Sequence, residues 1–499
     1  MSKHEKSLLV LNGLGLLLLF ALQLFQPHLP LNPQNMPRVP FWLTLNTAVS
    51  YTTNTNWQAY SGESTLGHLV QSFGLTVQNF LSAATGVAVL LALIRGIMRQ
   101  TAKTIGNFWS DLIRTVVYVL LPLSLIWSVL LVNQGVVQSW SGHPVATTLA
   151  GGQQAIPVGP VASQVAIKQL GTNGGGFFGA NSAHPFENPT PFSNFLEMLA
   201  ILLIPSSLVL MYGRMVGDKR QGWMLWGVMM ALLSAGLAAA LAAEFHYSGA
   251  APFSMEGKEQ RFGVSNSVLW AMATTCASNG SVNAMHSSLS PLAGGIALLN
   301  MMLGEVVFGG AGVGLTGMLV FVLVTAFIAG LMVGRTPEYL GKKIDAFEVK
   351  MAMIAILVPN AMILLGSAWA VSIPAGLAGR SAGGPHGLSE ILYAFTSASA
   401  NNGSAFAGLK ADAPFYHIAL ASAMLACRLA ALLPVLSIAG GFAAKQRLPV
   451  SAGTLRTDTV LFAGILVGVV LIIGALTFFP ALCLGPLLEQ ALLGLGRIF

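Results

Sequence analysis

Charged residues and cysteines are scarce in this chain of 499 residues. Only 8% of the residues are charged, whereas a soluble domain carries about 25%, so a soluble protein of this length could not cover its surface. The hydrophobic content of 54% also excludes a disordered chain. Three cysteines without a CxxC spacing provide no disulfide framework. The class that remains is a polytopic membrane protein.

Nucleotide-binding and catalytic motifs are missing as well. The chain has neither a Walker A string nor the Asp-Lys-Thr-Gly phosphorylation motif of P-type ATPases. A GxGxxG match at 312–317 lies inside an apolar run and follows no soluble strand, which excludes a dinucleotide site. We therefore expect no catalytic residues, no cofactor-binding residues and no bound nucleotide or nucleic acid.

Long apolar runs predict an all-α membrane protein, because a spanning helix needs about 20 mostly apolar residues. A run at 292–334 is too long for one straight helix and is interrupted by glycines at 309–314, so we count it as one broken span. With it, nine crossings are expected. The other runs lie at 7–26, 74–95, 112–133, 191–213, 223–243, 350–372, 416–440 and 458–480.

The distribution of Lys and Arg predicts the orientation. Alternate connections hold 16 and 7 of these residues, and Arg428 lies within a span. The positive-inside rule then places the N-terminus in the cytoplasm and the C-terminus outside. The first apolar stretch could be a signal peptide, but no small-residue cleavage site follows it, so we expect a retained helix.

Four polar strings recur in the long outer connections and predict internal repeats. Their aligned positions, Asn56, Gly174, Gly280 and Gly403, are 118, 106 and 123 residues apart. A short apolar segment precedes each string, near 42–51, 162–171, 263–275 and 387–398. Each repeat then consists of a span, a re-entrant helix, a polar loop and a span. The expected units are 1–110, 111–220, 221–345 with a broken second helix, 346–456, and a terminal transmembrane helix in 457–499.

Four such loops around one axis would place a ring of backbone carbonyls at membrane depth, where they can replace the hydration shell of a monovalent cation. Their neutral Thr, Ser and Asn residues favour K⁺, since a divalent cation would be expected to recruit carboxylates. The alternative is a set of ordinary Asn/Gly turns.

Two strings then identify a family. GTNGGGFF at 171–178, followed by NSAHPFENP at 181–189, resembles the signature of the KdpA family, the potassium-binding subunits of bacterial Kdp potassium-transporting P-type ATPases. The resemblance extends over essentially the whole chain. Further matching stretches lie at 46–50, 53–58, 74–84, 334–345 and 401–408.

The resemblance implies a pseudo-fourfold pore similar to K⁺ channels and Trk/Ktr transporters, located in the bacterial cytoplasmic (inner) membrane. It also implies a high-affinity K⁺ importer in which K⁺ passes through an intramembrane tunnel to a catalytic P-type ATPase subunit, with a small accessory subunit and membrane lipid as further partners. The K⁺ filter carried over from the family consists of Asn54, Thr55, Asn56, Thr172, Asn173, Gly174, Ser278, Asn279, Gly280, Asn401, Asn402 and Gly403.

A gate and a barrier are expected below the filter. The glycine-rich break at Gly309, Gly310, Gly312 and Gly314 resembles the family's gating loop, and its alternative role is helix packing through small residues. Glu305 could attract K⁺ into the tunnel, and Arg428 could block leakage into the cytoplasm, because ionisable residues at membrane depth are usually functional. Both could instead be structural charges that pair with polar groups or with each other.

Two departures from the family and three other functions remain open. The family usually has an additional N-terminal helix before the first repeat. The third filter reads Ser278-Asn279-Gly280, where Cys or a similar small residue is expected before the glycine. The leading alternative function is a stand-alone Trk/Ktr-like K⁺ channel or transporter. A secondary transporter for an organic substrate would be expected to use inverted repeats instead, and an enzyme in its own right is disfavoured by the missing motifs.

Overall fold

The computed structural model describes residues 3–248, 255–304, 306–449 and 455–497. Within these ranges nine segments are long and apolar enough to cross a membrane, which confirms the expected nine spans. They comprise Lys3–Leu24 (α1), Val77–Met98 (α4), Phe108–Thr115 with Leu121–Asn133 (α5, α6), Pro191–Met215 (α8), Lys219–Ser248 (α9), Val313–Met332 (α12), Ala346–Ser372 (α13), Pro414–Ala444 (α16), and Val460–Leu482 with Leu488–Gly494 (α17, α18).

Shorter elements connect the spans. Four short helices match the expected re-entrant segments, namely Phe41–Thr52 (α2), Val161–Leu170 (α7), Gly263–Cys276 (α10) and Gly384–Ser399 (α15). The remaining helices are Gly62–Thr65 (α3), Pro291–Met302 (α11) and Pro374–Leu377 (α14). Two antiparallel hairpins were not expected from the sequence, and they pair Val145–Thr147 (β1) with Gln153–Ala155 (β2) and Glu338–Tyr339 (β3) with Lys342–Lys343 (β4).

Local sequence signals start several of these helices. Thr190 and Ser193 form a capping box at the start of α8, where Pro191 occupies the first turn. Asp345 and Glu348 do the same for α13. These caps satisfy amide groups that no helical carbonyl can reach, so they fix where the spans begin.

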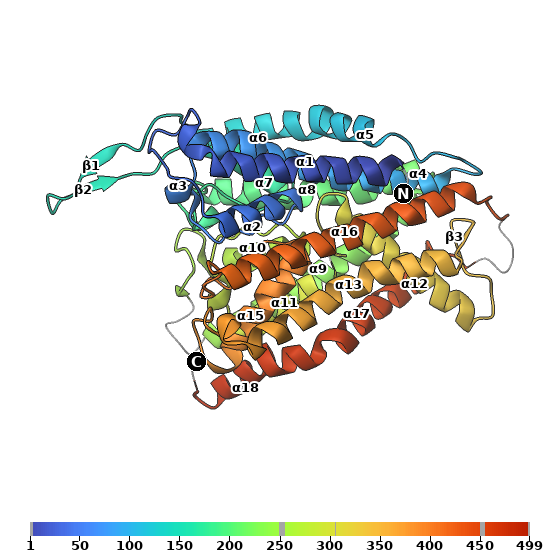
Figure 1. Cartoon of the computed structure of the whole chain (residues 1–499). Coiled ribbons are helices and arrows are strands. Elements are labelled where there is room, and N and C mark those ends of the chain that lie inside the picture. Colours follow the sequence, from blue (N-terminus) through green and yellow to red (C-terminus); the bar gives the residue numbers. More distant parts are fainter. Residues whose placement is uncertain (1–2, 249–254, 305, 450–454, 498–499) are drawn as a thin grey trace.

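The helices form a bundle. In chain order, each of the four short helices α2, α7, α10 and α15 follows one span and precedes the next. Helices α2, α7, α10 and α15 gather toward one end of the bundle, from which the β1–β2 hairpin projects (Figure 1). The β3–β4 hairpin lies at the opposite end, close to the N-terminus (Figure 1). The C-terminus is marked at the end with the short helices, so the two ends of the chain lie at opposite ends of the bundle (Figure 1).

The β3–β4 hairpin contacts the ends of α4, α8 and α16 at that far end. The buried Lys342 ammonium donates to the carbonyls of Arg99, Phe442 and Lys445 at 2.5, 3.0 and 2.5 Å. These carbonyls terminate α4 and α16, where the helix dipole favours a cation. Tyr339 contacts Tyr212 of α8, with 2.5 Å between the hydroxyl oxygens. The hairpin thereby holds three helix ends together.

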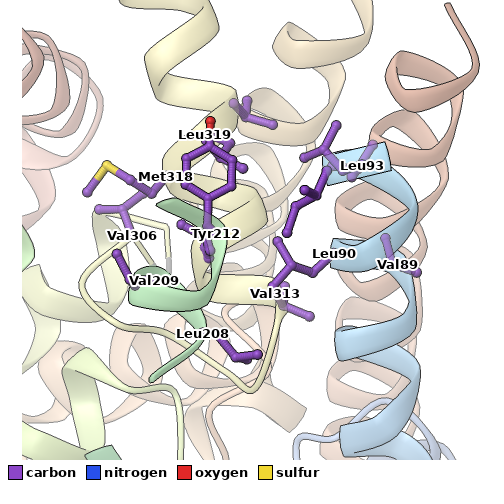
Figure 2. Close-up of a cluster of buried hydrophobic side chains, with 14 of the residues drawn as sticks. Val89, Leu90, Leu93, Leu208, Val209, Tyr212, Val306, Val313, Met318 and Leu319 are labelled. Carbon is purple, nitrogen blue, oxygen red and sulfur yellow. The ribbon is translucent and has the colours of Figure 1, made fainter. Parts of the chain in front are cut away.

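Apolar side chains fill the space between α4, α8 and α12. Figure 2 shows Leu90 and Leu93 from α4, Leu208 and Tyr212 from α8, and Val313 from α12 meeting in this cluster. Each of the five is buried. Helices α4, α8 and α12 therefore enclose a packed apolar core.

The apolar run at 292–334 contains the expected interruption, although its position differs from the prediction. Helix α11 ends at Met302 and α12 begins at Val313, so the connection runs over 303–312 rather than 309–314. Gly314 lies inside the first turn of α12, a correction to its expected place in the break. The left-handed backbone of Gly312, with φ of 84°, ends the connection and allows the helix to start directly after it.

Candidate functional site

The four polar strings adopt one shared backbone conformation directly after the four short helices. At their first position Asn54, Thr172, Ser278 and Asn401 have φ values of 64, 52, 49 and 48°. At their third position Asn56, Gly174, Gly280 and Gly403 have φ values of 53, 86, 91 and 99°. An extended strand points successive carbonyls in opposite directions, whereas left-handed residues at alternate positions turn them toward the same side.

The loops contact one another in cyclic order. An added Cβ on Gly174 would lie 1.9 Å from the Asn279 carbonyl oxygen, and one on Gly280 would lie 2.0 Å from that of Asn402. An added Cβ on Gly403 would lie 2.0 Å from the Thr55 oxygen. These contacts link the second loop to the third, the third to the fourth and the fourth to the first.

The ring closes between the first and second loops. The Asn54 side-chain amide donates to the Thr172 carbonyl at 3.0 Å, and the Asn173 amide donates to Asn54 Oδ1 at 2.6 Å. Residues more than 100 positions apart in the sequence therefore form a closed ring of four loops. The sequence-predicted filter residues are brought together at this ring.

Most carbonyls of the ring have no donor. Of the twelve predicted filter carbonyls, those of Thr172 and Gly174 accept side-chain hydrogen bonds. The other ten accept none from the residues that the structure describes. Eleven of the twelve residues are buried, and Gly403 is half-buried. Because a buried carbonyl without a partner costs free energy, this set is suited to binding a cation.

The first loop differs from the others because it has Asn56 where they have glycine. The Asn56 amide donates to Asn79 Oδ1 on α4 at 2.7 Å. The Ser82 hydroxyl, also on α4, donates to Asn54 Oδ1 at 2.8 Å. Asn tolerates the left-handed conformation better than most residues, and these contacts hold both asparagines in it.

The interruption of the third repeat passes next to the second loop and α4. The Ala311 amide donates to Thr172 Oγ1 at 2.8 Å. A Cβ on Gly312 would lie 2.4 Å from the backbone of Gly86 in α4. Gly309 and Gly310 belong to the same connection. The predicted gating segment is therefore in direct contact with the ring.

A cavity of about 70 Å³ lies beside the fourth loop, between α11, α12, α13, α16 and α17. Its lining is mainly apolar, with a few polar residues among them Asn401, Thr316 and Asn360. Ser399 and Ala400, which lead into the fourth loop, also line it. The cavity thus begins at the ring and extends between these five helices.

The predicted barrier residue Arg428 lies on α16 and is 4% exposed. Its guanidinium donates to the Ser82 carbonyl at 3.3 Å, and Ser82 in turn contacts Asn54 of the first loop. The positive charge of Arg428 is therefore separated from the first loop by one residue, Ser82. Glu305, the other charge predicted for this region, lies outside the described residues.

Sequence reasoning missed the buried charges behind the second loop. Lys168 on α7 is fully buried, and its ammonium pairs with the buried carboxylate of Glu187. Lys168 is one of the seven Lys and Arg residues in the connections expected to lie outside. Its place inside a predicted re-entrant helix was the available signal, because a lysine at membrane depth requires a partner.

Metal-binding side chains are not clustered in the described part of the chain, where no group of three His, Cys, Asp or Glu residues could hold a metal ion. The candidate ligands are therefore the backbone carbonyls of the ring. Such ligands suit a monovalent cation that is bound and released rather than a resident metal.

Comparison with known proteins gives a consistent family. Residues 1–491 match the family model described as KdpA, potassium-transporting ATPase A subunit. A potassium-transporting ATPase potassium-binding subunit from Sorangium cellulosum is 58% identical and is aligned over 97% of this chain and 87% of its own length. The corresponding protein from Yersinia enterocolitica is 57% identical over 98% of this chain and 88% of its own length.

A solved structure shares the fold. The crystal structure of the potassium transporter TrkH from Vibrio parahaemolyticus matches with a TM-score of 0.58 and 13% sequence identity, covering 87% of this chain and 85% of that one. This confirms the expected Trk/Ktr-like architecture. With a family model and near full-length relatives in agreement, the chain belongs to the KdpA family of potassium-transporting ATPase A subunits.

Proposed function

We propose that this chain is the K⁺-selective membrane subunit of an ATP-driven potassium importer and that the ring of four loops is its filter. The observation that carries the proposal is the set of ten ring carbonyls, nine of them in buried residues, that accept no hydrogen bond from the described residues. Carbonyl oxygens in a ring can replace the water around K⁺ at membrane depth. The names of the relatives, potassium-binding subunits of a potassium-transporting ATPase, support the choice of ion.

The proposed path leaves the axis after the filter. The apolar cluster of α4, α8 and α12 (Figure 2) would close the axis below the ring, and Arg428 adds a positive charge next to the first loop. The cavity that starts at Asn401 leads sideways between the third and fourth repeats. A K⁺ ion would pass through it toward a partner chain, and the connection that includes Gly309 and Gly310 would act as the gate.

ATP hydrolysis is assigned to a partner subunit, with a small accessory subunit and lipid completing the complex. The filter faces the outside in this proposal, and the β3–β4 hairpin with the N-terminus faces the cytoplasm. That orientation agrees with the excess of Lys and Arg in the connections on the hairpin side. The four repeats, 1–110, 111–220, 221–345 and 346–456, supply one filter loop each, and 457–499 contributes the last span.

Gly174→Asp tests the filter. The substitution places a bulky anion where an added Cβ would already lie 1.9 Å from the Asn279 oxygen, at a left-handed φ of 86°. We expect K⁺ affinity to fall at least about tenfold, equivalent to about 1.4 kcal/mol, and other cations to be admitted. The measurement is ATP hydrolysis by the complex purified from its native membrane, titrated with K⁺ and with Na⁺.

Gly151→Asp is the matched control, because Gly151 also has a left-handed φ of 82° and its added Cβ would meet nothing within 4 Å. It should leave K⁺ affinity unchanged. Unaltered K⁺ affinity and K⁺/Na⁺ selectivity in Gly174→Asp would contradict the filter. A chain that purifies without an ATPase and yet conducts K⁺ in liposomes would instead establish a stand-alone channel.

A further inference from the structure

The second filter loop is supported differently from the third and the fourth. Six residues before the third filter position stand Ser50, Thr274 and Ser397 in the first, third and fourth repeats, and Lys168 in the second. Thr274 Oγ1 accepts the Gly280 amide at 2.9 Å, and Ser397 Oγ accepts the Gly403 amide at 2.9 Å. A lysine has no acceptor on its side chain, so the second loop cannot be fixed in this way.

The Lys168 ammonium instead reaches the chain that follows the filter. It pairs with the Glu187 carboxylate and donates to Asn181 Oδ1 at 2.9 Å and to Ser182 Oγ at 2.7 Å. The other Glu187 oxygen accepts the Phe178 amide at 2.8 Å. Both charged side chains are completely buried. The pair therefore joins α7 to the segment that leaves the filter.

Asn181 transmits this arrangement to the ring. Its Nδ2 donates to the Gly174 carbonyl at 2.7 Å, while its Oδ1 is held by Lys168. The Ser182 backbone amide donates to the same oxygen at 2.8 Å, so Lys168 and this amide together fix which atom of the Asn181 side chain faces the filter. The Gly174 carbonyl therefore accepts a hydrogen bond. The carbonyls at the same position in the third and fourth loops, Gly280 and Gly403, accept none from the described residues.

A second hydrogen-bonded chain extends from the same cluster to the third loop. The buried Glu197 carboxylate accepts Ser182 Oγ at 2.7 Å and Gln169 Nε2 at 2.8 Å. Gln169 Oε1 accepts the hydroxyl of Ser281 at 2.9 Å, directly after Gly280. The Lys168 carbonyl also accepts the Asn279 amide at 3.1 Å. The cluster thus supports two adjacent loops of the ring.

From these contacts we infer that Lys168 and Glu187 are specificity-determining positioning residues, which act through Asn181 on the Gly174 carbonyl. The inference rests on the proposed filter and deepens it. A loop anchored by a fully buried ion pair resists contraction, because breaking one partner leaves an uncompensated charge. A ring that cannot contract leaves the smaller Na⁺ poorly coordinated and favours K⁺.

The test uses the double variant Lys168→Met/Glu187→Gln in the complete complex, reconstituted in liposomes. Removing both charges avoids a lone buried ion. We expect the K⁺/Na⁺ selectivity ratio of stimulated ATP hydrolysis and of uptake to fall by about tenfold, since Asn181 loses the charged donor that helps to orient it. The thermal unfolding midpoint is recorded alongside to separate lost stability from lost selectivity.

The matched control is Lys258→Met/Glu244→Gln. This pair is equally buried, with side-chain exposures of 0% and 2% and an N–O distance of 3.0 Å. Its contacts with Ser288 and Ser290 lie outside the filter loops. It should lower the unfolding midpoint and leave the selectivity ratio unchanged, as a merely structural ion pair would.

A second variant keeps the inference testable if the double variant does not assemble. Asn181→Ala retains the ion pair and removes the bond to the Gly174 carbonyl, so the selectivity ratio should fall in the same direction. An unchanged ratio in either assembled variant overturns the inference. If Gly174→Asp alters selectivity while these variants do not, the filter stands and the supporting role fails. If Gly174→Asp also leaves selectivity unchanged, the filter itself fails.

Discussion

At the scale of single residues, the site depends on left-handed backbone in places where side chains would collide. Gly280 has a φ of 91°, and an added Cβ would lie 2.0 Å from the Asn402 oxygen. Gly280→Ala should therefore displace the contact between the third and fourth loops. We expect K⁺ affinity to fall about tenfold or more, or about 1.4 kcal/mol, measured as the K⁺ concentration that half-maximally stimulates ATP hydrolysis.

Gly468→Ala provides the comparison, since its added Cβ would meet nothing within 4 Å in α17. Alanine is favoured over glycine inside a helix by about 1 kcal/mol, so this variant should be as stable as the parent or more so. Normal K⁺ affinity in Gly280→Ala would show that the loops do not need their close approach.

At the scale of elements, the last helix is attached to the helix that leads into the fourth filter loop. Glu489 on α18 accepts a hydrogen bond from His386 at the start of α15, with 2.8 Å between the atoms. This hydrogen bond raises the pKa of His386 above its ordinary value of 6.5. The folded state therefore favours the protonated imidazole more than the unfolded state does.

The sign of the pH dependence follows from that direction. The stabilisation is complete below the unfolded pKa of about 6.5 and is lost as the pH rises through the raised folded pKa. We expect the thermal unfolding midpoint to decrease slightly over this window, by less than about 1 kcal/mol of stability, because the pair is near the surface. His386→Gln should flatten this dependence, whereas the exposed His28→Gln should preserve it.

At the scale of the whole molecule, the proposed filter lies toward one end of the bundle, and several helix ends are joined at the other. The ring lies toward the end with the four short helices, and Lys342 joins the ends of α4 and α16 at the opposite end. Arg428 on α16 contacts Ser82 of α4, which bonds to the first loop of the ring. Arg428→Gln should raise the ATP-independent leak of K⁺ from liposomes about tenfold, because a cation opposes K⁺ in a medium of low dielectric.

The leak is measured as K⁺ efflux from loaded liposomes without ATP. Arg261→Gln is a suitable comparison, because this outer guanidinium contacts the carbonyls of Asn188 and Ala183 away from the ring, and its loss should not increase efflux. Equal efflux from Arg428→Gln and the parent would leave the apolar cluster and the hairpin as the effective seal.

Much of the architecture was predictable because its causes are local. A span must be apolar over its whole length to place its backbone in the membrane, so the nine spans follow from nine apolar runs. The four re-entrant helices were predicted to within three residues of their ends. Polar strings at matched spacing indicated four equivalent loops, and in the structure all four have left-handed φ values at their first and third positions.

Only the tertiary structure decided how these pieces act together. The interruption of the run at 292–334 begins at Leu303 because α11 ends at Met302, although the glycines that suggested it begin only at Gly309. The sequence alone suggests that Lys168 is a charge in a loop, whereas the fold places Glu187 and Asn181 in contact with its ammonium. Composition and spacing determined the membrane spans and the four loops, whereas the free or engaged state of each carbonyl depends on contacts between residues far apart in the chain, which no local pattern encodes.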